Sequence, residues 1–235
     1  MAELATQSLE CPRDTFLSLA GIPIAGPITP DVFAKLWDVS QPSTYGQRDS
    51  DERFANPEIR NSREINAVLF DFKFVQDLTS LVFKDLSCIA PSIEKAESEL
   101  PTVHPQSIVR HHATGTDRFA VRFHKCLLYR EDGHFAEHAD KLRHVNMTHT
   151  LVLNLEVSDP YQRYIFRYNG KDHWMGDGRM NYSIFQRNIP HGVTMKIGYR
   201  VCLVFHVVDN ATLSVGDSPF NSRDGSRNKL IILED

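Results

Sequence analysis

The stretch that decides the fold runs from Tyr129 to Asp140 and reads YREDGHFAEHAD. It predicts the end of one strand, a turn at Gly133 and a short second strand that carries His138 and Asp140. Side chains two positions apart on a strand point to the same face. The imidazole and the carboxylate are therefore expected to converge, as two of the three donors of a two-histidine, one-carboxylate Fe(II) site. A His-x-Asp pair in a turn is also common on solvated surfaces. The pair alone therefore fits both a metal site and an ordinary surface turn.

A second stretch, residues 189–206, offers a third donor and a cation. His191 begins one alternating apolar segment and Arg200 begins the next. Alternation predicts two faces for the second segment, with Arg200, Cys202, Val204 and His206 on one and Val201, Leu203 and Phe205 on the other. A guanidinium at the head of such a strand needs an anionic partner, because an unpaired buried charge is costly. Two interpretations stay open: a structural or edge arginine, and a bidentate clamp on a carboxylate ligand.

Together the two stretches resemble the 2-oxoglutarate- and Fe(II)-dependent dioxygenase superfamily, and within it the prolyl-hydroxylase-like branch. The resemblance covers roughly residues 100–208. Its pattern is Tyr-x-x-x-Gly-x-Phe-x-x-His-x-Asp, a gap of about fifty residues, and a His followed nine positions later by Arg. Here the pattern is formed by Tyr129, Gly133, Phe135, His138, Asp140, His191 and Arg200. Each part is weak alone, but the joint order and spacing are specific.

The resemblance implies a role for each of these residues. His138, Asp140 and His191 would hold Fe(II), and Arg200 would bind the distal carboxylate of 2-oxoglutarate, with Tyr129 as a further hydrogen-bonding partner. The implied reaction consumes 2-oxoglutarate and O2, releases succinate and CO2, and hydroxylates a C–H bond, with ascorbate as an accessory cofactor. No catalytic residue beyond the metal centre is expected. The implied substrate is a peptidyl side chain such as proline. Collagen-type prolyl hydroxylases carry Lys at a slightly different spacing, so Arg200 favours another branch.

Several alternatives remain open at this point. An oxygenase acting on a small metabolite fits the same residues. An oxidative nucleic-acid demethylase is disfavoured, because that branch carries a second arginine six residues after the clamp, where this chain has His206. A zinc hydrolase could use the same three ligands, whereas a cupin-like site would add histidines and lack the arginine. The non-enzyme alternative is a degenerate barrel that acts as a binding module. The remaining histidines are interpreted as structural or surface residues, with His149 and His206 as candidates for the cavity wall.

Composition and charge narrow the class of protein. The 235 residues are 41% hydrophobic and 24% charged, as in ordinary globular proteins, and the net charge is −4. Because no basic block stands out, a nucleic-acid partner is disfavoured, and a peptide, protein or small molecule is the expected substrate. The four cysteines show neither zinc nor redox spacing, which favours a reducing compartment. With no membrane-length apolar run and no leader, an intracellular location, cytoplasmic or nuclear, is expected. The oligomeric state is not indicated.

The order of predicted elements indicates an α+β, mainly β chain. Residues 1–100 are expected to form an irregular N-terminal segment with support helices, and residues 101–235 the dioxygenase core, in one structural domain overall. Helices are predicted over 30–39, with Thr29 as N-cap, within 63–89, and over 91–100. Residues 1–28 are predicted as irregular and 40–62 as an exposed loop. Strands are predicted over 102–113, 118–129, 147–157 and 162–168, with a two-residue hairpin turn at 169–170, and residues 182–187 lead toward His191. The family resemblance closes these strands into a double-stranded β-helix, or jelly roll.

Overall fold

The computed structural model describes a defined part of the chain. The described residues are 5–8, 17–46, 53–70, 74, 78, 80, 119–143, 146–158, 164–168, 171–175, 180–194 and 197–209. In this part the chain consists of strands and one continuous helix, α1 (Pro30–Val39). The prediction of a mainly β fold with a jelly-roll core and N-terminal helical support is confirmed. No described helix is both long and apolar enough to cross a membrane.

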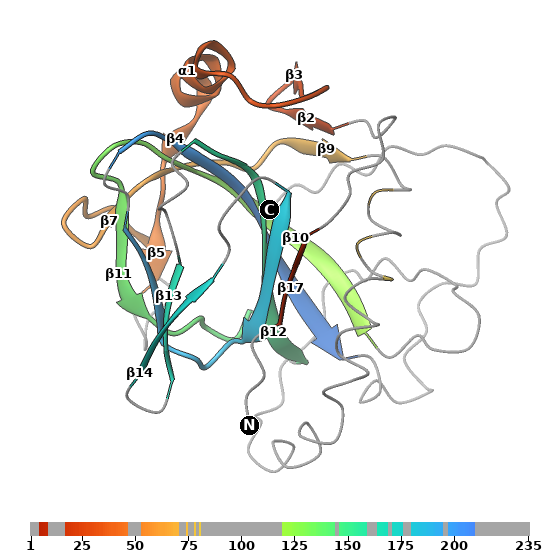
Figure 1. Cartoon of the computed structure of the whole chain (residues 1–235), viewed down its shortest axis with the longest axis vertical. Coiled ribbons are helices and arrows are strands. Elements are labelled where there is room, and N and C mark those ends of the chain that lie inside the picture. The colour runs from red at the N-terminus through yellow and green to blue at the C-terminus, as the bar shows by residue number, and fades with distance from the viewer. Residues whose placement is uncertain are drawn as a thin grey trace, which may run out of the picture.

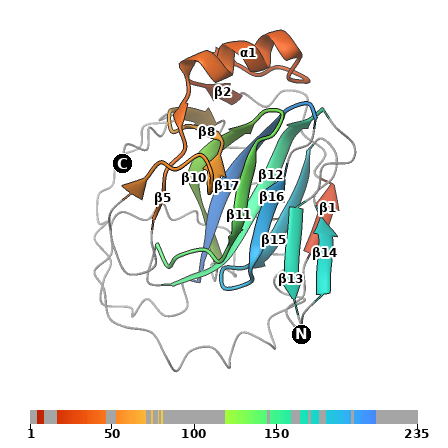
Figure 2. The same ribbon diagram turned by 90° about the vertical axis from the view of Figure 1, so that its left-hand side faces the viewer.

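Two antiparallel sheets form the body of the molecule. The larger sheet has seven strands, in the order β1 (Ala5–Ser8), β15 (Asn181–Gln186), β12 (Met147–Val157), β17 (Arg200–Asp209), β10 (Phe119–Tyr129), β8 (Arg63–Ile65) and β4 (Gln41–Pro42). The smaller sheet has five, in the order β14 (Lys171–Met175), β13 (Tyr164–Tyr168), β16 (His191–Thr194), β11 (His134–His138) and β7 (Arg60–Asn61). Figures 1 and 2 show the two sheets as separate layers, with β11 and β13 in front of β10, β12 and β17 in Figure 2.

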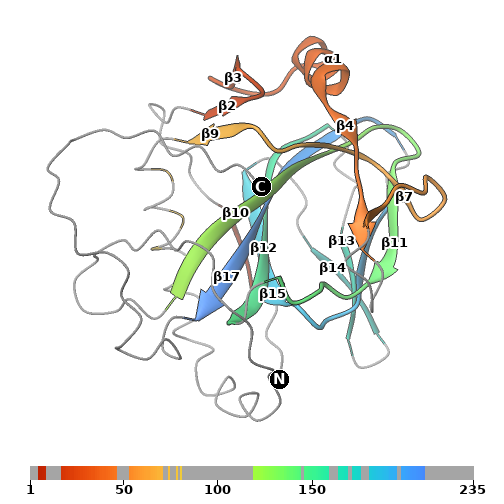
Figure 3. The ribbon, with the colours of Figure 1, turned by 180° about the vertical axis from the view of Figure 1, so that it is seen from behind.

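Two short sheets complete the described fold. The first has three strands, in the order β3 (Ile22–Pro23), β2 (Leu17–Leu19) and β9 (Val68–Phe70), and the second pairs β5 (Tyr45–Gly46) with β6 (Arg53–Phe54). Figure 3 shows β2, β3 and α1 at one end of the molecule, beyond β9 and β4. The β5–β6 pair lies beside β7 and β11, next to the cavity described below.

The alternation predicted for β17 is confirmed by the core. Val201, Leu203 and Phe205 pack on the outer face of the large sheet, against α1 through Phe33 and Leu36. Cys202 and Val204 point the other way, into a second apolar cluster with Val152, Phe185 and Val193. Because Val193 belongs to the smaller sheet, this second cluster fills the space between the sheets. The candidate site residues lie in the same space between the sheets.

Helix α1 forms as the sequence predicts. Thr29 caps it, since its hydroxyl accepts a hydrogen bond from the backbone N–H of Val32 at 3.4 Å, and Pro30 occupies the first turn. Phe33 stacks on Tyr199 with ring centroids 4.5 Å apart. The hydroxyl of Tyr199 donates to the carbonyl of Ile28 at 2.7 Å. The helix is thereby attached to the segment that leads into β17.

Two sequence predictions for the N-terminal part of the chain are wrong, and a third holds only in part. Residues 1–28 are not all irregular, because β1, β2 and β3 lie there. Residues 40–62 contain β4 to β7 rather than a plain exposed loop, and Arg60 is buried. The helix predicted within 63–89 does not include residues 63–70, which contain β8 and β9, whereas Phe74 and Leu78 are helical and buried. The cause is the same each time: pairing with distant strands, as of β8 with β10, overrides local propensity.

The later strands agree with prediction. The expected strands over 118–129, 147–157 and 162–168 correspond to β10, β12 and β13, and the segment that leads toward His191 contains β15. The predicted turn at 169–170 lies outside the described residues, and the strands on either side of it are paired, with Tyr168 opposite Lys171. The predicted helix over 91–100 and strand over 102–113 lie outside the described residues, and the division of the chain at residue 100 stays a prediction.

Candidate metal centre

The turn at Gly133 sets the path of β11. The Gly133 N–H donates to the carbonyl of Arg130 at 2.8 Å, and a Cβ at position 133 would lie only 2.7 Å from that oxygen. Only glycine fits such a close approach without backbone movement. Strand β11 then pairs with β16, with an irregularity between Phe135 and His138. Asp140 lies just beyond the strand rather than on it, which corrects the predicted local structure.

The three predicted ligands nevertheless come together. His138 lies directly opposite His191 in the β11–β16 register. Asp140 reaches both imidazoles, with Oδ1 3.6 Å from Nε2 of His138 and Oδ2 3.7 Å from Nε2 of His191. One donor atom from each of the three residues lies within 4.8 Å of the others. Among the histidine, cysteine and acidic side chains of the described residues, these three form the group that could hold a metal ion.

Hydrogen bonds orient the two imidazoles so that Nε2 of each ring faces Asp140. Nδ1 of His138 lies 2.9 Å from the carbonyl oxygen of Ala136, and Nδ1 of His191 lies 2.9 Å from that of Ile189. Because a carbonyl can only accept, both Nδ1 atoms must carry the proton and donate it. The lone pair of each neutral ring is then on Nε2, which faces Asp140. Such outer hydrogen bonds fix tautomer and ring orientation in metal-binding histidines.

Asp140 is held from two sides. Its backbone N–H donates to the carbonyl of Arg187 at 2.8 Å, and its Oδ2 accepts a hydrogen bond from the Thr150 hydroxyl at 2.5 Å. Burial alone would raise the pKa of Asp140, but the nearby imidazoles of His191 and His138 and the hydrogen bond from Thr150 outweigh it and lower that pKa. Burial lowers the pKa of His191. Asp140 is therefore ionised and His191 neutral near pH 7, the forms that bind a metal.

The donor set fits a divalent transition metal. Two imidazole nitrogens and one carboxylate on one side of an ion match the facial arrangement that binds non-haem Fe(II) and leaves positions open for other ligands. The same three donors would also accept Zn²⁺ with an open fourth position. The observed geometry thus supports a metal centre that can take further ligands.

Arg200 and Tyr129 lie deeper between the sheets. They are opposite each other in the β10–β17 register, and each has about 1% of its surface exposed. The Arg200 guanidinium donates from Nε to Oδ1 of Asn154 at 2.9 Å, and its Nη2 contacts the same oxygen. Tyr129 lines the cavity that also contains the metal-ligand candidates, whereas Arg200 is buried and is not among the lining residues. Burial raises the pKa of Tyr129, so its hydroxyl stays protonated and able to donate.

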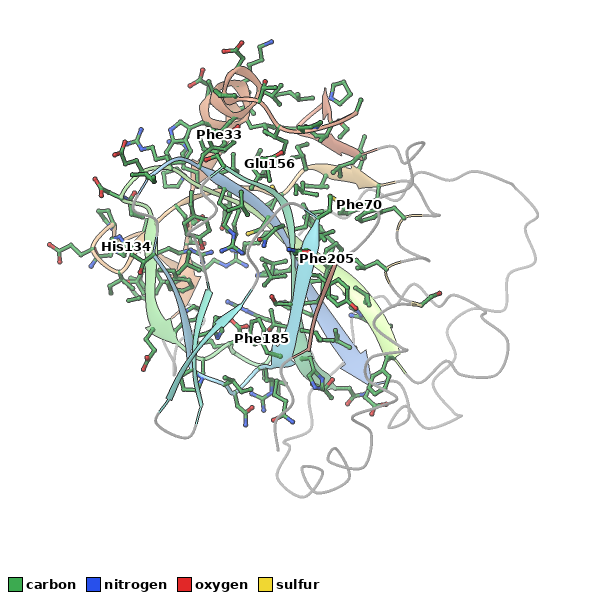
Figure 4. All side chains as sticks on the ribbon, in the orientation of Figure 1. Phe33, Phe70, His134, Glu156, Phe185 and Phe205 are labelled. Carbon is green, nitrogen blue, oxygen red and sulfur yellow. The ribbon has the colours of Figure 1, made fainter. Side chains whose placement is uncertain are left out.

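A cavity of about 190 Å³ lies beside Tyr129 and the three metal-ligand candidates. Its inner wall includes Tyr129, Val152 and Val204, the three metal-ligand candidates lie along it, and His124 and His206 stack at its side with ring centroids 4.4 Å apart. The expectation for His206 is confirmed. His149 is buried and does not belong to the wall. Figure 4 shows Phe185, which packs on His191 with centroids 4.6 Å apart, between the two sheets.

Several site residues were not anticipated from the sequence. Thr150 and Asn154, which hold Asp140 and Arg200, lie on β12 and look like ordinary strand positions, although Asn154 is an isolated amide in an apolar run. The segments 44–46 and 59–60 line the cavity from within the region predicted as a loop. Their composition carries no signal of this role, since the short strands there form only by pairing with distant partners.

No model of a known protein family matches this sequence, and no curated protein matches it. Several solved structures are similar to it. They include an oxidoreductase of the 2OG-Fe(II) oxygenase family from Burkholderia pseudomallei, with 15% identity over 40% of this chain and 47% of that chain and a TM-score of 0.34. This chain therefore spans about half the length of that oxygenase.

Two further similar structures are prolyl hydroxylases, the branch that the sequence resembles. One is a Pseudomonas putida prolyl-4-hydroxylase, with 14% identity, a TM-score of 0.45 and coverage of 88% of this chain and 93% of that chain. The other is a Trichoplax adhaerens prolyl hydroxylase in complex with a hypoxia inducible factor peptide fragment, with 14% identity, a TM-score of 0.42 and coverage of 76% and 75%.

Proposed function

We propose that this chain is an Fe(II)- and 2-oxoglutarate-dependent dioxygenase that hydroxylates a C–H bond of an organic substrate. The observation that carries the proposal is the convergence of His138, Asp140 and His191 at the wall of a cavity, with donor atoms within 4.8 Å of one another. Both imidazoles are held in the tautomer that carries the proton on Nδ1 and the metal-binding lone pair on Nε2. The residue spacing of the family pattern, which continues to Arg200, supports the same function.

Each residue then has a defined task. His138, Asp140 and His191 would hold Fe(II), which when bound supplies the oxidative chemistry that converts 2-oxoglutarate and O2 to succinate and CO2 and hydroxylates the substrate. Arg200 would bind the distal carboxylate of 2-oxoglutarate by charge-assisted hydrogen bonds, and the Tyr129 hydroxyl would donate to the same co-substrate. Asn154 holds the Arg200 guanidinium in place. The apolar side chains of Val152, Val193 and Val204 exclude water from the space between.

The substrate is proposed to be a peptidyl side chain, with proline as the first candidate, as the prolyl-hydroxylase-like pattern implies. A small metabolite is the alternative. In either case the C–H bond must reach the metal through the cavity, which passes directly beside His138 and Asp140.

The test is succinate release from 2-oxoglutarate by the purified full chain with Fe(II) under air. The expected result is a metal-dependent release that His138→Ala abolishes together with tight metal binding. His134→Ala is the matched control, because His134 lies on the same strand but hydrogen-bonds Glu58 instead of facing the triad. Succinate release at the parent rate in His138→Ala would refute the proposal.

A further inference from the structure

The cavity carries an excess of positive charge. Four cationic side chains line it against two carboxylates: Arg60, Lys125, Lys141 and Arg143 against Glu137 and Asp140. Asp140 is a proposed metal ligand, and Lys125 is paired with the buried Glu64, at 2.6 Å, behind the wall. The net charge of the whole chain is −4. The positive cavity is therefore a local feature that favours an anionic ligand.

Arg60 is the buried member of this group, with 8% of its surface exposed. Its Nε donates to the Ser62 hydroxyl at 3.1 Å, its Nη1 donates to the Thr44 carbonyl at 3.0 Å, and its guanidinium lies 4.3 Å from the ring centroid of Phe135. None of these contacts is with a carboxylate of the described residues. A buried guanidinium without a counter-ion is costly, so an anionic ligand would complete its environment.

The side chains of Lys141 and Arg143 both lie beside Gly46. A Cβ at Gly46 would lie 3.4 Å from Nζ of Lys141 and 3.6 Å from Nη2 of Arg143. Since Arg60 donates to Thr44, two residues away, three cationic groups surround the segment Thr44–Gly46 at the cavity wall. Three cationic groups gathered at one segment favour the binding of an anion among them.

The three cations also lie next to the metal centre. The Phe135 ring carries Arg60 on one side and stacks on His138, with ring centroids 3.6 Å apart. Lys141 directly follows Asp140 in the chain. The three cationic side chains and the metal-ligand candidates therefore line the same cavity.

We propose that Arg60, Lys141 and Arg143 form a binding site for a carboxylate or phosphate group of the primary substrate. The inference deepens the proposed function and rests on it, because the distal carboxylate of 2-oxoglutarate is there assigned to the buried Arg200. The second cationic site then selects substrates that carry an anionic oxygen group close to the C–H bond that is hydroxylated. Such a group can belong to a small organic acid or phosphate ester, or to an acidic residue of a peptide.

Gly46 offers a direct test, since a side chain there meets only the flexible ends of Lys141 and Arg143. Gly46→Asp places a carboxylate between the two cations, and Gly46→Asn is the neutral control of equal size. Inorganic phosphate is titrated calorimetrically into the full chain, alone and with saturating Mn²⁺ and 2-oxoglutarate under anaerobic conditions. We expect phosphate to bind the parent and Gly46→Asn in both states, and Gly46→Asp about tenfold or more weakly. Arg143→Gln, a substitution of an exposed side chain, is expected to weaken binding in the same direction.

Equal phosphate affinity in the parent, Gly46→Asp and Arg143→Gln would overturn the inference, as would the absence of phosphate binding in the parent. Loss of phosphate binding when 2-oxoglutarate is added would also overturn it, because the cations would then serve the co-substrate. The proposed function fails separately, by absence of 2-oxoglutarate binding in the parent. A triglutamate peptide distinguishes the two substrate sources: affinity well above that of phosphate indicates an acidic peptide, and comparable affinity indicates a small anion.

Discussion

Thr150 and Asp140 form the closest link between the large sheet and the metal-ligand candidates. The Thr150 hydroxyl on β12 donates to Oδ2 of Asp140 at 2.5 Å, and Thr150 is itself 2% exposed. Oδ2 is also the oxygen that faces His191, at 3.7 Å from Nε2. The hydrogen bond therefore fixes the carboxylate rotamer that the candidate centre requires.

Thr150→Val should weaken metal binding while the fold is retained. Valine has the shape of threonine but cannot donate a hydrogen bond, so Asp140 loses one restraint on its orientation. Removing such an outer partner typically lowers metal affinity about 10- to 100-fold. The measurement is a calorimetric titration with Mn²⁺ or Zn²⁺, and Thr150→Ser, which keeps the hydroxyl, is the control. Parent-like affinity in Thr150→Val would show that the hydrogen bond does not orient the ligand.

Asn154→Asp should interfere with 2-oxoglutarate binding without removing Arg200. The substitution replaces the neutral oxygen that now accepts from Arg200 with a carboxylate, which would compete with the distal carboxylate of the co-substrate. We expect the Kd for 2-oxoglutarate to rise about tenfold or more, comparable to the effect of Arg200→Ala, while the metal affinity is unchanged. An unaltered Kd in both variants would remove Arg200 from the anchoring role.

The long strands and the ligand set could be predicted because their signals are local or carried by spacing. β12 and β17 alternate over ten or more residues, and this period defines their faces without knowledge of partners. The spacing of His138, Asp140 and His191 likewise pointed to one centre. The strand itself ends at His138, however, because β11 has an irregularity in its pairing with β16.

The part of the cavity wall formed by residues 44–46 and 59–60 could not be predicted for a physical reason. β4, β5, β6 and β7 have two residues each, too few for any periodicity to appear. Arg60 is buried because β7 pairs with β11, with Arg60 opposite Phe135, a residue far from it in the sequence. Long-range pairing of this kind gives polar residues a buried role that their neighbours in sequence do not reveal.

Glu64→Gln should destabilise the fold strongly. Lys125 and Glu64 form an ion pair of 2.6 Å, with side chains only 8% and 2% exposed. Burial, together with the charge of Arg60, lowers the pKa of Lys125 to about 8 despite the favourable effect of Glu64. Glutamine would leave a buried ammonium without its counter-ion, at a cost of about 3–5 kcal/mol in the free energy of unfolding at pH 7.

The matched control for that substitution removes both charges. Glu64→Leu combined with Lys125→Met is expected to be far less destabilising than Glu64→Gln, because no charge is left buried. Urea denaturation of the three proteins at pH 7 provides the comparison. A double variant as unstable as Glu64→Gln would mean that the shape of the site, and not its charge balance, determines stability.

His149→Gln should reduce the sensitivity of the fold to acid. His149 is 2% exposed on β12, and burial lowers its pKa to about 4 in the folded chain, against 6.5 ordinarily. Between these two pH values the unfolded chain binds more protons at this residue than the folded chain, so stability falls as the pH falls through the window. The loss is up to roughly 3 kcal/mol and is absent above about pH 6.5. We expect the difference in free energy of unfolding between parent and His149→Gln to shift in favour of the variant between pH 6.5 and 4.5, as measured by urea denaturation. A constant difference across this range would show that His149 takes up its proton equally well in both states, contrary to its burial.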